Sequence, residues 1–189
     1  MMVNRFCTLV LMAGALAVAF AGPAAAQFSD TWEFMEAVEK RDYREMRSRL
    51  FKGANINARN SDGLPSIVVA AEAGDLELAR FLVGQGANVN ATTEGRGETA
   101  VMRAAELGRD AMLRYLLENG ADFDREDRGG ETPLMKAAKA RQEDAAEILI
   151  EAGADALLED YTGRTALQFA EEARARGIIR LLEGLGAAN

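Results

Sequence analysis

The chain has 189 residues, 22 of them basic and 30 acidic, which gives a formal net charge of −8 at pH 7. This acidic balance argues against broad nucleic-acid binding, which requires a basic surface that displaces counterions. The sequence has no histidine and one cysteine, Cys7. It therefore lacks the commonest general base, the imidazole ligand of metals and haem, and a set of thiolates for zinc. We expect no catalytic residue, no metal and no cofactor.

Residues 1–26 have the layout of a secretory signal peptide. Arg5 supplies a positive start, Phe6 to Phe20 is apolar, and Ala24-Ala25-Ala26 is a small-residue cleavage site. The alternative is an uncleaved membrane anchor, because the uncharged stretch from Phe6 to Ala26 is just long enough to span a bilayer. Gly22-Pro23 ahead of the alanines favours cleavage after Ala26, which would also remove the cysteine.

A pattern of glycines recurs along the rest of the chain with a period of about 33 residues. Gly-Ala pairs begin at five positions, 33 or 34 residues apart: Gly53, Gly86, Gly120, Gly153 and Gly186. Another glycine stands 23 residues before each of the last four: Gly63, Gly97, Gly130 and Gly163. Asp30 occupies the corresponding position ahead of the first pair.

The best-formed copy of this pattern reads as two short helices and a stop. Thr132 can cap a helix with its hydroxyl, and Pro133 at the first helical position has no N–H that needs a partner. A second helix is predicted from about Glu143. Gly153 stands where a left-handed residue ends that helix, because glycine takes a positive φ without a Cβ penalty. By the same pattern, Leu149 should be buried and Gly120 should have a positive φ.

This period, with Thr132-Pro133-Leu134 and the Gly-Ala pairs as landmarks, resembles the ankyrin repeat. The resemblance covers residues 28–189 and implies an all-α fold, a solenoid of helix-turn-helix units joined by β-hairpin-like loops. Because one repeat cannot bury its apolar face alone, stacked neighbours should form a continuous core. We expect a signal peptide at 1–26 and an ankyrin-repeat domain at 27–189, with five repeats at about 28–60, 61–92, 93–126, 127–159 and 160–189.

Three of the repeats depart from the pattern. The first lacks Thr-Pro-Leu, and its helices are expected at roughly Trp32–Arg41 and Tyr43–Lys52, with the polar outer face of a terminal cap. In the second, Pro65-Ser66-Ile67 replaces the motif, so the helix cap should shift to Ser66. The third has one extra residue within 92–96, in the loop between units, where insertions are tolerated.

The acidic run Asp122–Asp127 looks like the start of a calcium-binding loop. Such a loop needs glycine at its sixth position and a carboxylate at its twelfth. Here these positions hold Asp127 and Pro133. We therefore expect an ordinary repeat loop there and no metal site.

The resemblance implies that partner proteins bind to a concave face, formed by the loop tips and the exposed sides of the first helices. A basic strip along repeats three and four would face an acidic patch of the partner, since the first helix of the fourth repeat is basic and its second helix is acidic. The alternative is binding through the apolar tips Leu64 and Tyr161. The partner-binding candidates are Leu64, Arg96, Arg103, Arg128, Lys136, Lys139, Tyr161 and Arg164.

The sequence thus predicts a non-enzymatic, exported scaffold that binds a protein partner in the periplasm, with full secretion as the alternative location. The resemblance to exported bacterial ankyrin proteins implies stress defence, in which this chain could only assist an enzyme such as a catalase. The alternative function is an inhibitor or immunity-type protein that occludes an enzyme or a toxin. We expect a monomer that binds no nucleic acid and, once the leader is removed, no membrane.

Overall fold

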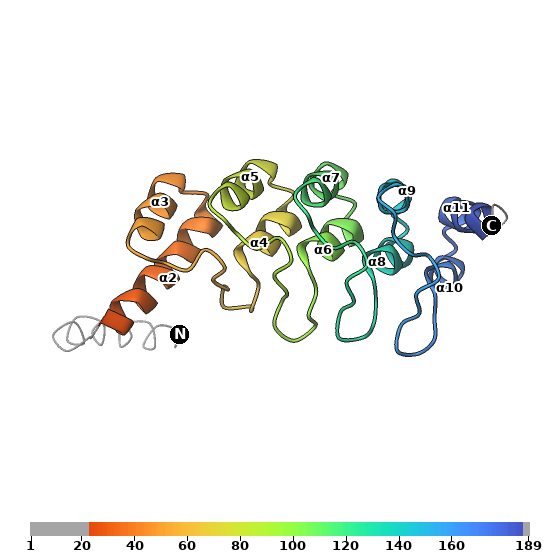
Figure 1. Ribbon diagram of the computed structural model, residues 1–189, viewed down its shortest axis with the longest axis horizontal. Helices are drawn as coiled ribbons and strands as arrows, with labels where there is room; N and C mark the ends of the chain where they lie inside the picture. Colours follow the sequence, from red (N-terminus) through yellow and green to blue (C-terminus); the bar gives the residue numbers. More distant parts are fainter. Residues whose placement is uncertain (1–22, 187–189) are drawn as a thin grey trace, which may run out of the picture.

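The structure is a computed structural model that describes the backbone of residues 23–186 and the side chains of residues 29–185. Within this range, ten helices follow one another in five pairs (Figure 1). The pairs are α2 (Pro23–Lys40) with α3 (Tyr43–Phe51), α4 (Ser66–Ala73) with α5 (Leu76–Gly84), α6 (Ala100–Glu106) with α7 (Asp110–Glu118), α8 (Pro133–Ala140) with α9 (Glu143–Glu151), and α10 (Ala166–Glu172) with α11 (Arg176–Gly186).

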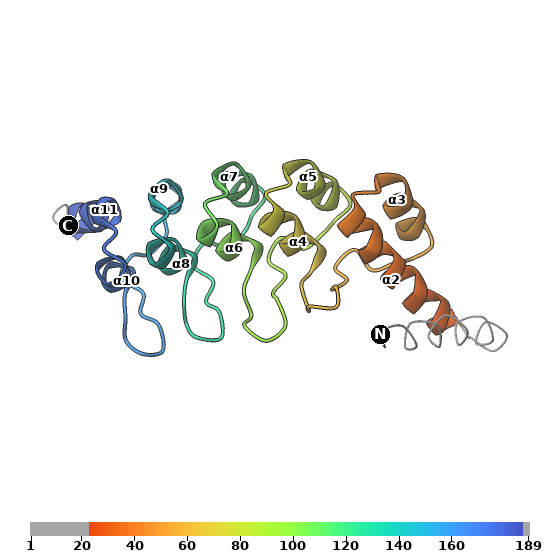
Figure 2. The same ribbon diagram turned by 180° about the vertical axis from the view of Figure 1, so that it is seen from behind.

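The pairs stack side by side, so that the molecule is elongated with α2 and α11 at opposite ends. The first helices of the pairs form one row and the second helices form another, and the long loops between pairs project from the row of first helices (Figures 1 and 2). This arrangement confirms the expected all-α solenoid of helix-turn-helix units.

Where a threonine precedes a helix, the helix begins at the position that the sequence predicts. The hydroxyl of Thr132 accepts a hydrogen bond from the backbone N–H of Met135 at 3.4 Å, and Pro133 begins α8 as predicted. Thr99 caps α6 in the same way. The prediction for Ser66 was wrong: Pro65 is the cap residue of α4, and the Ser66 hydroxyl donates to the Ile56 carbonyl at 2.6 Å instead.

Helix ends follow the glycine pattern. Gly53, Gly86, Gly120 and Gly153 all have a positive φ, between +81° and +99°, directly after the second helix of a pair. The predictions for Gly120 and Gly153 are therefore confirmed. A left-handed residue at this position turns the chain out of the helix and into the next loop.

Helix α2 is the main departure from the expected helix bounds. It begins at Pro23 and not near Trp32, because proline and three alanines are well suited to the first turns of a helix. Residues 1–22, which hold most of the predicted signal peptide, lie outside the described residues, so the leader and its cleavage stay predictions. Among residues 23–186, no helix combines the length and the apolar character needed to cross a membrane.

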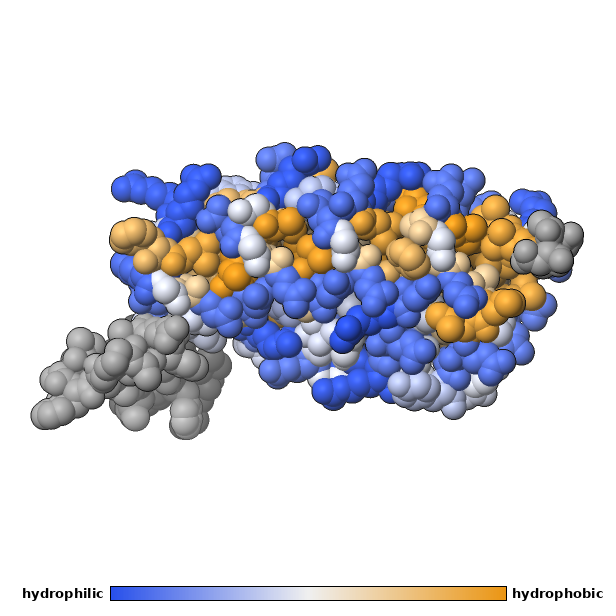
Figure 3. Space-filling model, in the orientation of Figure 1, coloured by the Kyte–Doolittle hydropathy of each residue, from blue (hydrophilic) through white to orange (hydrophobic). Residues whose placement is uncertain are grey.

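The core runs along the stack without interruption. Leu149 is fully buried, as predicted, and it belongs to one cluster that reaches from Phe34 in α2 to Leu182 in α11. Alanines from the first helices fill much of it, which lets neighbouring pairs approach closely. On the face seen in Figure 3, an apolar band follows the long axis and has hydrophilic residues on both sides.

The loops that project from the stack, here called fingers, are residues 59–65, 92–99, 126–132 and 159–165. Three are pinched at their base by a single antiparallel bridge: Arg59 with Pro65, Thr92 with Thr99, and Glu159 with Thr165. The second finger contains the extra residue. Its second end still joins α6 in the usual way, since Thr99 caps that helix. The insertion is therefore absorbed inside the finger.

Candidate partner-binding surface

The fingers are tied to one another in a row. The backbone N–H of Glu94 donates to the carbonyl of Gly63 at 3.0 Å, and that of Arg128 donates to Arg96 at 2.9 Å. The Tyr161 N–H donates to Gly129 at 3.1 Å in the same manner. Each finger thus holds the one before it, and their tips form a continuous edge of defined spacing.

Three candidate side chains lie exposed on this edge. Arg96 keeps 75% of its side chain exposed, with a contact of 3.6 Å to Glu98. Arg128 is exposed as well, and Tyr161 is 71% exposed. The Tyr161 ring covers Gly130, where an added Cβ would lie 2.6 Å from the ring and 2.8 Å from the Tyr161 nitrogen. Leu64, the fourth tip candidate, is half-buried against the core.

Lys136 is buried, in contrast to the exposed position that we expected. Only 7% of its side chain is exposed, and its Nζ lies 2.7 Å from Asp127, 2.7 Å from Glu131 and 3.3 Å from Glu98. These carboxylates come from the second and third fingers, which fold over the start of α8. A partner cannot reach this ammonium without displacing them.

The pKa values of Lys136, Asp127 and Glu131 all shift in favour of their charged forms. Burial alone would lower the pKa of Lys136, but its contacts with Asp127 and Glu131 outweigh that effect and raise it well above its ordinary value. Burial would raise the pKa of Asp127 and of Glu131, yet their contacts with Lys136 leave both pKa values lowered. Ion pairs of Lys136 thus connect the second and third fingers to α8.

Three further candidates are neutralised by carboxylates. Arg103 contacts Glu72 at 2.8 Å and also pairs with Glu106. Lys139 lies 2.9 Å from Glu131, and Arg164 lies 2.9 Å from Asp160; both cations also face the Phe169 ring. Several charges of the expected basic strip along repeats three and four thus belong to internal ion pairs, while Arg96, Arg128 and Lys139 remain exposed. Whether any of the eight candidates binds a partner stays a prediction.

Sequence reasoning missed the residues that shape the fingers. The Oδ1 of Asn60, Asp127 and Asp160 each accepts hydrogen bonds from two backbone N–H groups inside its own finger, two and four residues later. In the longer finger, the Thr93 hydroxyl accepts from Glu98 instead. These residues recur at the repeat period, and a search for Asn or Asp at the base of each loop would have found three of them.

Asp127 therefore holds its finger and the Lys136 ammonium together. This structural role explains why an aspartate ends the acidic run that resembled a calcium-binding loop. Within the part of the chain that the structure describes, no group of His, Cys, Asp and Glu side chains is arranged to hold a metal ion.

Individual relatives match parts of the chain only. The ankyrin repeat and SAM domain-containing protein 6 of Rattus norvegicus is 37% identical over 68 residues, which is 36% of this chain and 8% of that protein. A putative ankyrin repeat-containing protein of Treponema pallidum is 36% identical over 75 residues, 39% of this chain and 25% of that protein. The NF-kappa-B inhibitor cactus of Drosophila melanogaster is 39% identical over 65 residues, 34% of this chain and 13% of that protein. The chain spans a quarter or less of the length of these relatives.

Family models give the wider match. A model of ankyrin repeats in three copies matches residues 34–127, and a model of ankyrin repeats in many copies matches residues 116–170. Together they cover residues 34–170, which include α3 to α9 and all four fingers. The number of repeats and their boundaries stay predictions, because neither model covers the first helix or the last pair completely. With the helix pairs, the finger loops and these two matches in agreement, the chain belongs to the ankyrin-repeat family.

Proposed function

We propose that the protein is a non-enzymatic, exported scaffold that binds a partner protein through its finger row and the adjoining first helices. The fold supports this proposal, since ankyrin repeats suggest protein binding. The observation that carries it is the finger edge itself. Backbone hydrogen bonds fix the spacing of the fingers, so Arg96, Arg128 and Tyr161 are held exposed at little further entropic cost.

The chemistry of the edge favours tyrosine and arginine as binding anchors. These residue types dominate the binding energy of protein interfaces, because they combine a large contact area with directional polar groups. Arg128 forms no ion pair among the described residues, so its guanidinium is available to a partner. The predicted leader at residues 1–26 supports binding in the periplasm, and we further propose that the protein acts there as a monomer.

The test compares how well two double variants capture the partner. The two variants carry equivalent chemical changes on different surfaces. Tyr161→Ala with Arg128→Glu alters the finger edge. Phe51→Ala with Lys52→Glu makes the same kind of change at the end of α3, in the other row of helices, where both side chains are exposed. Tagged protein is expressed in its own cells, cross-linked and purified, and the captured proteins are identified by mass spectrometry.

The proposal expects one protein to be recovered with the native chain and with the α3 variant, and to be lost with the finger variant. Equal recovery by both variants would refute the finger edge as the binding surface. Recovery of no specific protein by the native chain would refute the scaffold function.

An inhibitor is the second candidate function, and a relative supports it. The matched protein of Drosophila melanogaster is itself named an inhibitor. If this chain occludes an enzyme or a toxin, the captured partner should lose activity when the native chain is added and keep it when the finger variant is added. A scaffold that assists a stress-defence enzyme would leave the activity unchanged or raise it.

A further inference from the structure

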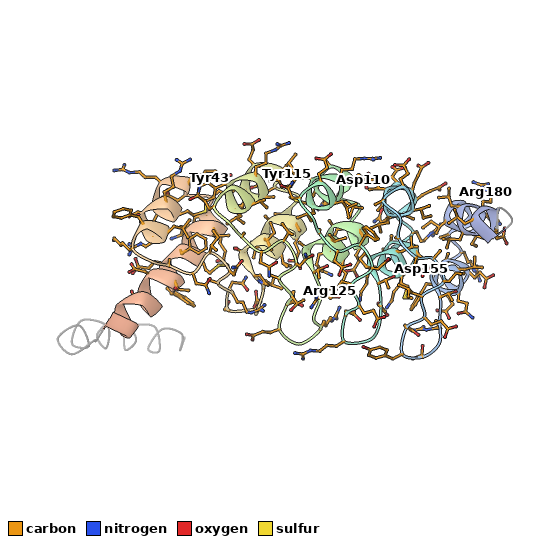
Figure 4. All side chains as sticks on the ribbon, in the orientation of Figure 1. Tyr43, Asp110, Tyr115, Arg125, Asp155 and Arg180 are labelled. Atoms are coloured by element: carbon orange, nitrogen blue, oxygen red, sulfur yellow. The ribbon has the colours of Figure 1, made fainter. Side chains whose placement is uncertain are left out.

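Four arginines gather at one end of the stack, away from the fingers. Arg141 lies in the turn between α8 and α9, Arg174 in the turn between α10 and α11, and Arg176 and Arg180 on the first two turns of α11. All four are exposed and line one open cavity of about 640 Å³, the arginine pocket. Figure 4 labels Arg180 on α11, in the row of second helices.

None of these four arginines forms an ion pair among the described residues. Many arginines elsewhere do: Arg49 contacts Asp30, Arg103 contacts Glu72, and Arg164 contacts Asp160. The one carboxylate that lines the pocket is Glu143. The pocket therefore concentrates positive charge in a chain whose net charge is −8.

The backbone at two of the four positions is costly for arginine. Arg141 has φ +62° and Arg174 has φ +56°, in the left-handed region that favours glycine. At the same turn of the earlier pairs, Gly74 and Gly108 have φ +67° and +61°, and Arg41 has φ +58°. The chain thus carries arginine at two neighbouring turns where glycine would be less strained, and both side chains line the same cavity. What distinguishes this pair from Arg41 is that the two side chains lie at neighbouring turns and line one cavity.

The start of α11 accommodates an anionic group, and Glu143 supplies one in this structure. Ala175, which precedes the helix, has no side-chain acceptor, whereas Asp42 and Asp75 cap α3 and α5 at the corresponding position. The Glu143 carboxylate lies directly over Gly177, where an added Cβ would be 1.8 Å from Glu143 Oε2. Glycine thus leaves room for a carboxylate beside the N–H groups of the helix, and the chain's own Glu143 shows that such a group fits there.

The size and lining of the pocket favour an extended ligand. A volume of about 640 Å³ falls within the range of ligand sites and far exceeds the volume of one small anion. Ala175 and Ile178, both buried, contribute an apolar lining that can contact the methylene groups of acidic side chains. Guanidinium groups bind carboxylates through two parallel hydrogen bonds.

We propose that the arginine pocket binds a short segment of the partner protein that is rich in Asp and Glu. This inference rests on the proposed function, since it assigns the partner a second contact beyond the finger edge. It also locates the attraction for an acidic partner at the α11 end of the stack.

The test measures binding of a short fluorescein-labelled peptide of alternating Asp and Glu to the full chain, by fluorescence anisotropy. The variant Arg141→Gly with Arg174→Gly removes two guanidinium groups and relieves the two strained turns, so it should fold at least as well as the native chain. The control, Arg41→Gly with Arg114→Gln, removes the same charge elsewhere and includes the equivalent left-handed turn at Arg41, φ +58°.

The inference expects the pocket variant to bind the peptide on the order of tenfold more weakly than the native chain, and the control to bind it nearly unchanged. A peptide with Gln and Asn in place of Glu and Asp should not bind. Equal losses in both variants would overturn the inference, as would binding of inorganic pyrophosphate without binding of the peptide.

The pocket and the proposed function can fail separately. If the acidic peptide does not bind but the finger variant still loses a captured protein, the pocket is refuted and the scaffold stands. If the pocket variant alone loses the peptide and no protein is captured from cells, the pocket stands as an acidic-peptide site and the scaffold is refuted.

Discussion

Replacing Lys136 by methionine should lower the free energy of unfolding far more than replacing an exposed lysine does. The side chain keeps a similar length, but the three carboxylates around it lose their common cation. Asp127 would have no cation left within 4 Å, while Glu131 would keep Lys139 and Glu98 would keep Arg96.

The size of the expected loss of stability follows from the burial of these carboxylates. Asp127 and Glu98 are each 6% exposed, so their charges would be left in a poorly solvated place. Breaking a buried ion pair from one side costs about 3–5 kcal/mol. For a chain of this size, that corresponds to a fall in Tm of about 6–20 °C.

The matched control is Lys139→Met, three residues away on the same helix. Lys139 contacts the same Glu131 but is 56% exposed, so its loss should cost at most about 1 kcal/mol. Urea denaturation followed by circular dichroism, at pH 7 and at about pH 2.5, below the ordinary carboxyl pKa values, measures both variants.

The pH dependence of the free energy of unfolding gives a second test. Folding lowers the pKa of Asp127 and of Glu131, so their contribution to the stability of the native chain is present above their ordinary pKa and is lost as the pH falls through the lowered values. Lys136→Met removes the main cause of that lowering. The loss of stability in this variant should therefore be largest at pH 7 and should shrink only as the pH falls below the ordinary carboxyl pKa values and through the lowered ones. A deficit no larger than that of Lys139→Met, at both pH values, would refute the reasoning.

Three further predictions concern the core, the finger row and export. Leu149→Ala should lower the free energy of unfolding by about 2–5 kcal/mol, because Leu149 is fully buried, whereas Leu157→Ala at an exposed position should change it by less than about 0.5 kcal/mol, as urea denaturation will show. Gly130→Ala should destabilise more than Gly120→Ala in the same assay: both glycines have a positive φ, but only at Gly130 would the new Cβ meet the next finger, with a backbone nitrogen 2.8 Å away. Mass spectrometry of the exported protein should find Gln27 at its N-terminus, and the full-length chain in the membrane fraction would contradict a cleaved leader.

The sequence predicts the helix pairs well because their signals are local. A threonine before Pro133 and a glycine after α9 each act through a few neighbouring backbone groups, so a pattern that recurs every 33 residues indicates where helices begin and end. The start of α2 was misjudged because the predicted cleavage site separated the alanines from the helix that they begin.

The candidate surface was harder to predict because its electrostatics depend on contacts between loops distant in sequence. Lys136 was expected on the exposed side of α8, and only the folded fingers bring Glu98 and Asp127 over it. Its burial could not follow from the helical period. Arg141 and Arg174 posed a similar difficulty, since arginine gives no local sign of a left-handed turn that glycine would give.

The extra residue of the second finger has a practical consequence for labelling the molecule. The finger takes up one residue more than its neighbours, yet the next finger still donates its Arg128 N–H to Arg96. Chain length in this loop is therefore uncoupled from the packing of the helices on either side. A cysteine or a short epitope placed between Glu94 and Gly97 would sit at the exposed tip. It would offer a site for a fluorophore or an antibody that reports on events along the finger edge without disturbing the stack.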